Sequence, residues 1–204
     1  MYIPKHFATD EPAVIKSLIA DYGFGILLSS DLEATHLPLL YEPGDGQLGC
    51  LFGHFAKANK QWQQADKQRV LVIFQGPHAY ISPSWYQSKP AVPTWNYVAV
   101  HCYGYLQLLT DSENQQVMTR LVAKYEPELL NQPDIMPDDY QAKLRHGVVG
   151  FKIILDDIQA KEKLGQHRAA ADQAAVYSRL QHCTDPAAMG LAAYMAKRKL
   201  GTGS

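Results

Sequence analysis

The chain has 204 residues, 47% of them hydrophobic, and a formal net charge of −1. This length predicts one domain with a short appendage, and the apolar content suffices for a core, which excludes an intrinsically disordered chain. A net charge near zero provides no global attraction to nucleic acid or anionic lipid. The three widely spaced cysteines form no CxxC pair, and the sequence shows neither a signal peptide nor a membrane span. We therefore expect a cytoplasmic protein with reduced thiols.

The N-terminal part of the chain predicts one helix followed by a series of strands. Apolar residues at helical spacing follow Pro12, and Gly23 ends the helix. The next segments are β-prone and are separated by turn residues, including a hairpin signal at 43–46. Strands are expected at 24–28, 34–40, 48–53 and 69–75, and a short helix is expected at 58–64.

A long strand is predicted from Thr94 to Leu109, and its two faces differ in composition. One face is small and β-branched, which suits the interior of a barrel. The other face is aromatic and amphipathic, which suits a subunit interface or the wall of a ligand site. The first face holds Asn96, Val98, Val100, Cys102 and Gly104, and the second holds Trp95, Tyr97, Ala99, His101, Tyr103 and Tyr105.

The remainder of the chain predicts helices around one further strand. Thr110 and Glu113 fit a capping box for a helix that ends near Tyr125, and Pro186 is expected at the first position of the last helix. The order of elements is typical of an α+β fold with a mainly antiparallel sheet, for which a closed or partly closed barrel is economical. The other elements expected are helices at 138–145, 172–183 and 185–199 and a strand from 148 to about 158.

The segment from Gly53 to Asn59 is a candidate anion site. Lys57 and His54, together with free N–H groups near the start of the next helix, could hold a phosphate; a solvated turn with a surface lysine is the alternative. Thr35 and His36 could add a hydroxyl and a ring N–H, or they could be ordinary strand residues. The histidines and serines show no metal-ligand or nucleophile motif, so neither a metal site nor a hydrolase is predicted.

Other aromatic and basic residues leave several interpretations open. The cluster of Trp85, Tyr86, Trp95 and Tyr97 suits core packing, packing between subunits or stacking on a planar ring. The basic segment from Ile158 to Arg168 either approaches a cofactor or neighbouring subunit, or is simply a charged strand exit. Lys197-Arg198-Lys199 either contacts a phosphate or complements the dipole of the last helix.

Long motifs, taken in order, resemble the PaiB-like, FMN-binding negative transcriptional regulators of bacteria. The resemblance covers most of the first 168 residues and implies a split β-barrel of the flavin-binding type over 1–168, followed by a helical extension over 169–204 that packs on or near it. The motifs are MYIPKHF from Met1, ATHLPLL from Ala34, GHFAKANKQW from Gly53, VLVIFQGPHAYISPSWY from Val70, VPTWNYVAVHCYG from Val92 and GFKIILDDIQAKEKLGQHR from Gly150.

The resemblance also implies a cofactor, partners and a function. The related pyridoxamine-phosphate oxidases and flavin reductases are homodimers that hold FMN in a groove between subunits. The chain is therefore expected to be a homodimeric, FMN-binding transcriptional regulator, with a flavin-dependent oxidoreductase of the same fold as the alternative. The sequence shows no helix-turn-helix pattern with a basic recognition helix, so the expectation of DNA as a partner rests on the resemblance alone.

The motif positions imply which residues contact FMN. Residues expected near the phosphate are Thr35, His36, His54 and Lys57, with Asn59 nearby. Residues expected to face the isoalloxazine or the partner subunit are Trp95, Asn96 and Tyr97, and those expected where the last strand approaches the flavin are Gln166 and Arg168. Lys60 stands where the family pattern ANPQW has proline.

Overall fold

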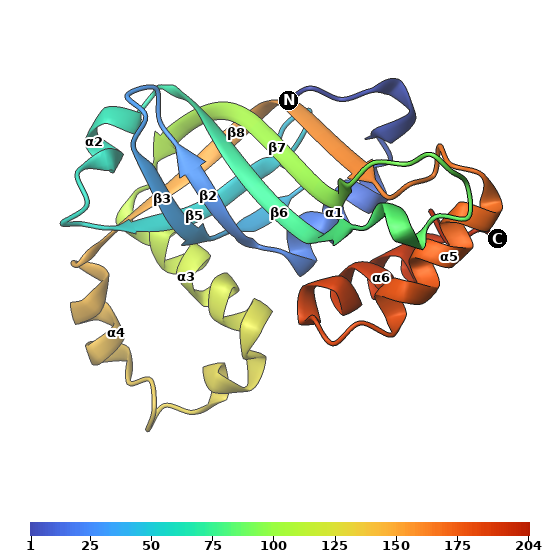
Figure 1. The fold of residues 1–204 in the computed structure, drawn as a ribbon. Coiled ribbons are helices and arrows are strands. Elements are labelled where there is room, and N and C mark those ends of the chain that lie inside the picture. Colours follow the sequence, from blue (N-terminus) through green and yellow to red (C-terminus); the bar gives the residue numbers. More distant parts are fainter. The chain divides into compact units, whose positions relative to one another are not determined.

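The computed structural model describes every residue from Met1 to Ser204. Seven strands of its eight-stranded sheet follow the order β3-β2-β6-β7-β8-β5-β4, and β1 pairs with β8 (Figure 1). The pairs β1–β8, β2–β3, β2–β6, β4–β5 and β5–β8 are antiparallel, so the α+β class with a mainly antiparallel sheet is confirmed. The strands are β1 (Ala8–Thr9), β2 (Phe24–Leu28), β3 (Ala34–Pro38), β4 (Leu40–Glu42), β5 (Cys50–Ala56), β6 (Arg69–Ile81), β7 (Thr94–Leu108) and β8 (Val148–Lys163).

Helices occupy most of the remaining chain. The capping box predicted at the start of α3 is confirmed, because the Thr110 hydroxyl accepts the Glu113 N–H while the Glu113 carboxylate accepts the Thr110 N–H. Pro186 begins α6 directly after its N-cap Asp185, as predicted. The helices are α1 (Pro12–Asp21), α2 (Gln61–Ala65), α3 (Asp111–Tyr125), α4 (Asp138–Arg145), α5 (Ala170–Gln181) and α6 (Pro186–Arg198), with 3-10 helices η1 (Lys5–Phe7), η2 (Pro83–Trp85) and η3 (Pro127–Asn131).

The chain divides into two compact units. Each of the strands β6, β7 and β8 has one part in unit 1 and the other part in unit 2. The division expected from the sequence, 1–168 and 169–204, is not tested by this partition and stays a prediction. Unit 1 comprises Met1–Ile15, Gln75–Val100 and Gln159–Ser204, and unit 2 comprises Lys16–Phe74 and His101–Ile158.

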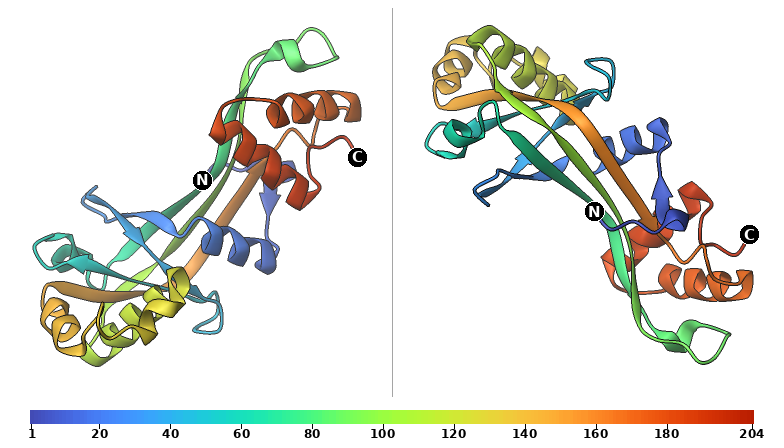
Figure 2. Two further views of the ribbon diagram at one scale, coloured as in Figure 1. Left: turned by 90° about the horizontal axis from the view of Figure 1, so that it is seen from below. Right: turned by 90° about the horizontal axis from the view of Figure 1, so that it is seen from above.

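In unit 1, α5 and α6 pack against each other, and both views of Figure 2 show these orange and red helices side by side. The carboxylate of Asp172 on α5 accepts N–H bonds from Gln87 at 2.8 Å and Ser88 at 2.9 Å. These bonds, the one from Ser88 foremost, lower the pKa of Asp172. The loop after η2 is thereby attached to the start of α5.

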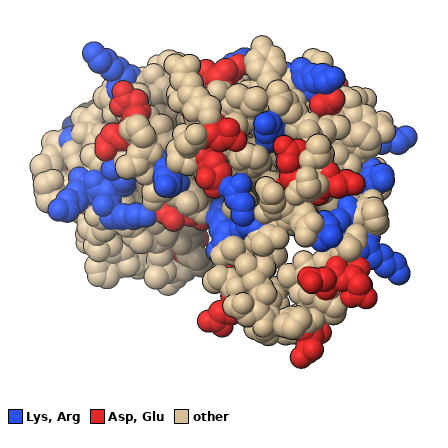
Figure 3. All heavy atoms as spheres, turned by 180° about the vertical axis from the view of Figure 1, so that it is seen from behind, with Lys and Arg blue, Asp and Glu red and all other residues tan.

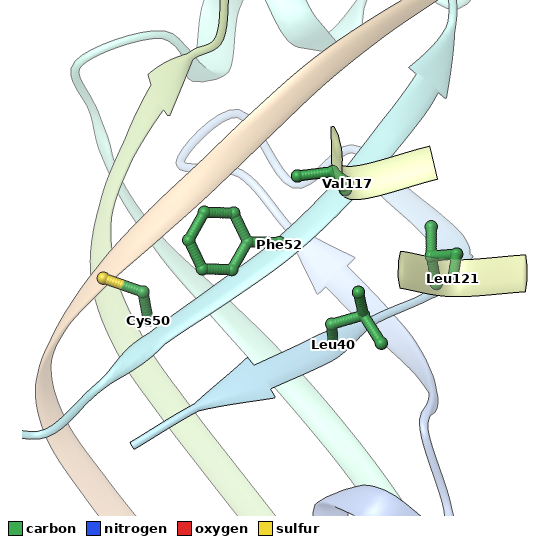
Figure 4. Packing of buried hydrophobic residues seen from close by; sticks show 5 residues of the cluster. All are labelled: Leu40, Cys50, Phe52, Val117 and Leu121. Atoms are coloured by element: carbon green, nitrogen blue, oxygen red, sulfur yellow. The ribbon is translucent and has the colours of Figure 1, made fainter. Parts of the chain in front are cut away.

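In unit 2, α3 packs on the strand pair β4–β5. Its buried residues Val117 and Leu121 contact Leu40, Cys50 and Phe52, and Figure 4 shows these side chains meeting between the helix and the strands. The three-to-four-residue spacing along α3 places both aliphatic side chains on one face of the helix. This packing fixes α3 against the sheet and leaves its remaining faces for other contacts.

The two-faced character predicted for the long strand is confirmed on β7. The face that begins at Asn96 is buried throughout, and its members Val98 and Cys102 are completely inaccessible. The opposite face is half-buried or exposed, with Trp95 52% exposed and Tyr105 50% exposed. Desolvation is the main cause that raises the pKa of the Cys102 thiol to about 12, so this cysteine is an unreactive core residue.

Some strand boundaries differ from the prediction. The strand expected over 34–40 is two strands, because Leu39 donates its N–H to Gly23 O at 2.8 Å while β3 pairs with β2 and β4 pairs with β5. The last strand does not end near Ile158 but continues to Lys163, since its final part pairs with β1. Lys161 and Lys163 therefore lie on the strand itself and not on its exit.

Candidate functional site

Thr35 and Asn59, two of the predicted site residues, lie together in unit 2. The Asn59 amide donates a hydrogen bond to the Thr35 hydroxyl at 2.8 Å, and that hydroxyl donates to the Gln61 side-chain carbonyl at 2.5 Å. The Asn59 side-chain carbonyl accepts the backbone N–H of Gln61 at 2.9 Å. A hydroxyl has a single donor, so Thr35 has none left for a phosphate while this network is intact.

Gln61 holds this network in place. Its side chain is 3% exposed, and its amide nitrogen donates to the Ser29 hydroxyl at 3.0 Å and to Glu33 O at 2.8 Å. The amide thus connects α2 to the turn between β2 and β3. Sequence reasoning missed Gln61, although its place two residues after Asn59 in the GHFAKANKQW motif was an available signal.

The other phosphate candidates of unit 2 have separate surroundings. The ring of His36 lies 6.0 Å from the ring of Phe24. The Lys57 side chain is exposed, and its backbone N–H donates to Gly147 O at 2.8 Å. Lys60, the N-cap of α2, has φ −74°, within the range that proline adopts, so the backbone is compatible with the proline of the family pattern.

His54 lies on the face of β5 that α3 covers. It lines an apolar cavity of about 270 Å³ together with Met118, Leu121 and Val122 of α3. Its Nδ1 is buried and has no hydrogen-bond partner, and burial lowers the pKa of the ring. His54 is therefore neutral at pH 7 and shares no hydrogen bond with Thr35 or Asn59.

An aromatic surface lies at the start of β7, in the part of this strand that belongs to unit 1. The Trp95 ring lies 5.7 Å from the ring of His78 and 6.3 Å from that of Tyr80, both on β6. Trp95 and Tyr80 remain 52% and 46% exposed. Asn96 lies on the opposite face of β7 and is only 2% exposed. Trp95, and not Asn96, is therefore accessible to a ligand at the surface.

Two lysines of β8 lie next to these aromatic residues. The Lys163 ammonium donates to Trp95 O at 2.6 Å and to the Thr94 hydroxyl. The Lys161 ammonium lies 5.0 Å from the centre of the Tyr97 ring and donates to Tyr2 O at 3.0 Å. Sequence reasoning placed both lysines in a basic segment but did not select them as site residues.

Gln166 and Arg168 follow the end of β8. The Gln166 amide donates to Glu162 O at 2.6 Å and its carbonyl accepts Leu164 N–H at 2.8 Å, which closes the turn at Gly165, where φ is +84°. The guanidinium of Arg168 lies 4.7 Å from the centre of the Tyr86 ring, and its Nε is buried without an acceptor. Arg168 thus carries an unused donor, whereas Gln166 is occupied in the turn.

Positive charge accumulates at the end of β8, where the Asp172 carboxylate interacts electrostatically with Arg168 and offsets only part of it. Lys161, Lys163 and Arg168 form no ion pair, and the nearby Glu162 carboxylate is already bound by Arg198 at 2.7 and 3.0 Å and by the Tyr194 hydroxyl at 2.6 Å. Burial foremost, and then repulsion from Lys161 and Arg168, lowers the pKa of Lys163. We call Trp95, Tyr97, Lys161, Lys163 and Arg168 the basic–aromatic cluster.

The donors of the basic–aromatic cluster fit a phosphorylated aromatic molecule. Cationic N–H groups with spare capacity form strong hydrogen bonds to phosphate oxygens, and an exposed indole offers a surface for a planar ring. Arg168 Nε is a buried donor without an acceptor, and because buried donors are normally paired, a phosphate oxygen bound here would satisfy it.

Solved structures of low sequence identity share this fold. The flavocytochrome Anf3 from Azotobacter vinelandii superposes with a TM-score of 0.59 at 11% identity and covers 80% of this chain and 73% of that one. The FAD and heme binding protein from Mycobacterium smegmatis gives 0.54 at 10% identity and covers 78% of this chain and 74% of that one. At these identities the likeness concerns the fold alone, and it confirms the split β-barrel.

The sequence comparisons identify the family. A family model described as "Putative FMN-binding domain" matches residues 1–157, and the chain belongs to this family. It is 40% identical over 202 residues to "Protease synthase and sporulation protein PAI 2" of Bacillus subtilis (strain 168), covering 96% of each chain. The PaiB-like family and FMN as the cofactor, both expected from the sequence, are confirmed; the residues that contact FMN stay a prediction.

No helix has the length and apolar character needed to cross a membrane.

Proposed function

We propose that this protein is an FMN-binding transcriptional regulator that works as a homodimer and holds the flavin at a groove between subunits. The observation that carries the proposal is the basic–aromatic cluster, in which three cations, none of them in a salt bridge, adjoin an exposed tryptophan. FMN combines a phosphate dianion with a large planar ring, so each half of the cofactor meets a complementary group.

Within this proposal, Lys163 and Arg168 bind the flavin phosphate. Lys163 is already oriented by Trp95 O and the Thr94 hydroxyl, and Arg168 by the Tyr86 ring, so little side-chain entropy is lost on binding. When bound, FMN supplies an isoalloxazine ring that accepts or donates electrons. Trp95 supports that ring and shields it from water, while His36 and Lys57 of unit 2 are the alternative phosphate ligands.

The homodimer is supported by the exposed aromatic surface of Trp95 and Tyr80. Large apolar side chains exposed next to one another are typical of surfaces that bind a partner, and aromatic residues are enriched in such interfaces. A second copy of this chain would cover them and would exclude water from the flavin. Sedimentation of the purified protein at several concentrations tests this, and a monomer with bound FMN would contradict it.

The regulatory role is supported by the likeness to the Bacillus subtilis relative, whose name, "Protease synthase and sporulation protein PAI 2", refers to a protease synthase and to sporulation. On the face drawn in Figure 3, basic and acidic side chains are interspersed, so this face offers no continuous basic stripe. A gel shift against DNA upstream of the protein's own gene tests the role. Binding that weakens steeply with added salt is expected, and the lack of a shift at low salt would reject it.

The cofactor proposal is tested by titrating the protein with FMN and, in parallel, with riboflavin, which lacks the phosphate. We expect saturable changes in the flavin absorbance bands and tighter binding of FMN than of riboflavin, because the cations act on the phosphate. Equal affinity for the two flavins would exclude the basic–aromatic cluster as the phosphate site. No binding of FMN at high micromolar concentration would reject the cofactor role itself.

A flavin-dependent oxidoreductase remains the second candidate, favoured by the same basic–aromatic cluster next to a redox-active ring. It differs from the regulator in one observable. Anaerobic addition of NADH or NADPH would bleach the bound flavin of an oxidoreductase, whereas the flavin of a regulator that uses FMN only as a ligand would stay oxidised.

A further inference from the structure

The helix α3 has a second apolar face besides the one in the core. Val117 and Leu121 point into the cluster with β4 and β5, as Figure 4 shows. The neighbouring positions Met118 and Val122 are displaced around the helix axis and line cavities outside that cluster. The second face is therefore directed at other elements of unit 2.

The segment that follows α3 packs unusually little. From Pro127 to Arg145, which includes η3 and α4, no residue is buried. Figure 1 shows this yellow segment running from the end of α3 to α4. A segment of this length without a buried side chain gains little stability from its own packing. The apolar side chains it leaves exposed are Leu130, Ile135, Tyr140 and Leu144.

Two adjoining cavities lie between α3 and this segment. The first has a volume of about 490 Å³ and is lined mainly by apolar groups, among them Met118, Val122, Tyr140 and Leu144. The second has a volume of about 810 Å³ and is lined by η3, the following loop and α4. Five residues line both, so the cavities are direct neighbours, and the first has the size of ordinary small-molecule sites. The shared residues are Gln115, Thr119, Met136, Gln141 and Arg145.

The polar groups of the first cavity leave one charge unpaired. The Thr119 hydroxyl donates to Gln115 O at 3.1 Å, and the Gln141 amide donates to Met136 O at 2.7 Å. Arg145 is the single charged residue in the lining, and its side chain forms no ion pair or hydrogen bond. An apolar cavity with one free guanidinium is complementary to a molecule with an apolar body and an anionic end.

The acidic residues near the two cavities do not cancel the preference of the first cavity for an anionic ligand. Asp138 and Asp139 line only the second cavity and belong to the first turn of α4, where carboxylates offset the helix dipole. The first cavity, where an apolar body would lie, contains no acidic side chain. Arg145 stands at the junction of the two cavities and faces both.

We propose that the cavity between α3 and α4 is a second ligand site, which binds an amphipathic carboxylate. The apolar body lies against Met118, Val122 and Leu144, and the carboxylate binds the guanidinium of Arg145. All lining residues belong to unit 2, whereas the basic–aromatic cluster belongs to unit 1, so the site does not depend on the FMN proposal. A ligand there covers apolar surface of Tyr140 and Leu144 that the free protein leaves exposed, which gives the bound state a structural difference from the free state.

The test uses the full-length protein and a fluorescent apolar anion, 8-anilinonaphthalene-1-sulfonate, as the probe. We expect saturable binding at one site per chain, and displacement by dodecanoate at lower concentration than by dodecanol or dodecylamine. Displacement by the amine at concentrations as low as those of the carboxylate would overturn the anionic preference. The absence of saturable binding would overturn the site.

Two variants with matched controls locate the site. Arg145→Gln should weaken dodecanoate binding about tenfold and leave dodecanol binding unchanged, because a charged hydrogen bond is removed. Lys143→Gln, on the same helix but outside the lining, should change neither. Thr119→Trp should block the cavity from an exposed position of α3, whereas Gln116→Trp should not. Unchanged binding in Thr119→Trp, or equal losses in both members of either pair, would overturn the proposal.

Discussion

The ammonium of Lys163 donates a hydrogen bond to the backbone carbonyl of Trp95 at 2.6 Å, which joins the end of β8 to the start of β7 within unit 1. A cation is thereby held beside an exposed indole, although the two residues are far apart in the sequence. Neutral acceptors hold the ammonium without cancelling its charge. The charge therefore remains available to an anionic ligand.

Replacing Lys163 should separate phosphate recognition from ring recognition. We expect Lys163→Met to weaken FMN binding about tenfold and to leave riboflavin binding unchanged, since only the phosphate loses a charged hydrogen bond. Fluorescence titration of both flavins measures this. Lys57→Ala serves as the comparison in unit 2: if it causes the larger loss of FMN affinity, the phosphate binds at Lys57 and not at the basic–aromatic cluster.

Gln61 should be a stability determinant of unit 2. Gln61→Leu removes a hydrogen bond from the Ser29 hydroxyl and from Glu33 O and leaves the Thr35 hydroxyl without an acceptor, and losing these part-buried bonds is costly. We expect a loss of about 2 kcal/mol in the free energy of unfolding, measured by urea denaturation. Gln64→Leu changes an exposed residue of the same helix and should alter that free energy by less than about 0.5 kcal/mol.

The buried ion pair of Glu162 and Arg198 should tie α6 to β8. Glu162→Gln keeps the shape of the side chain but leaves the Arg198 guanidinium without its main carboxylate, so we expect a loss of about 3 kcal/mol of stability in thermal or urea unfolding. Glu11 also contacts Arg198, at 3.2 Å, but its side chain is 63% exposed. Glu11→Gln should therefore cost no more than about 0.5 kcal/mol, and similar losses for both variants would contradict the assignment.

His54 should contribute to acid sensitivity. Burial lowers its pKa below the ordinary value of 6.5, so the unfolded chain binds the proton more readily than the folded one. The free energy of unfolding should be independent of His54 above about pH 6.5 and should fall as the pH drops through the lowered pKa. Urea denaturation of wild type and His54→Gln over this range measures the difference. A variant whose stability falls as steeply with acid as the wild type would show that His54 is not responsible.

Local sequence determined those features that depend on near neighbours in the chain. The capping box of Thr110 and Glu113, the helix start at Pro186 and the alternation along β7 need only adjacent residues, so their prediction succeeded. The sequence motifs also sufficed to predict the family and its cofactor, because several long motifs that match a family in the same order are specific to it. Strand ends were less predictable, since the extension of β8 to Lys163 depends on pairing with β1, a segment far away in sequence.

Only the tertiary structure decided how the candidate residues are used. The Thr35 hydroxyl donates to Gln61, and His54 lies against α3. Gln166 closes the turn at Gly165, whereas Arg168 Nε has no acceptor. The tertiary structure also brings Lys163 to Trp95 and leaves Arg145 unpaired beside an apolar cavity. The sequence by itself determined the fold class, the family and the types of side chain present. Hydrogen-bond occupancy, burial and charge compensation depend on contacts between distant segments, which folding alone supplies.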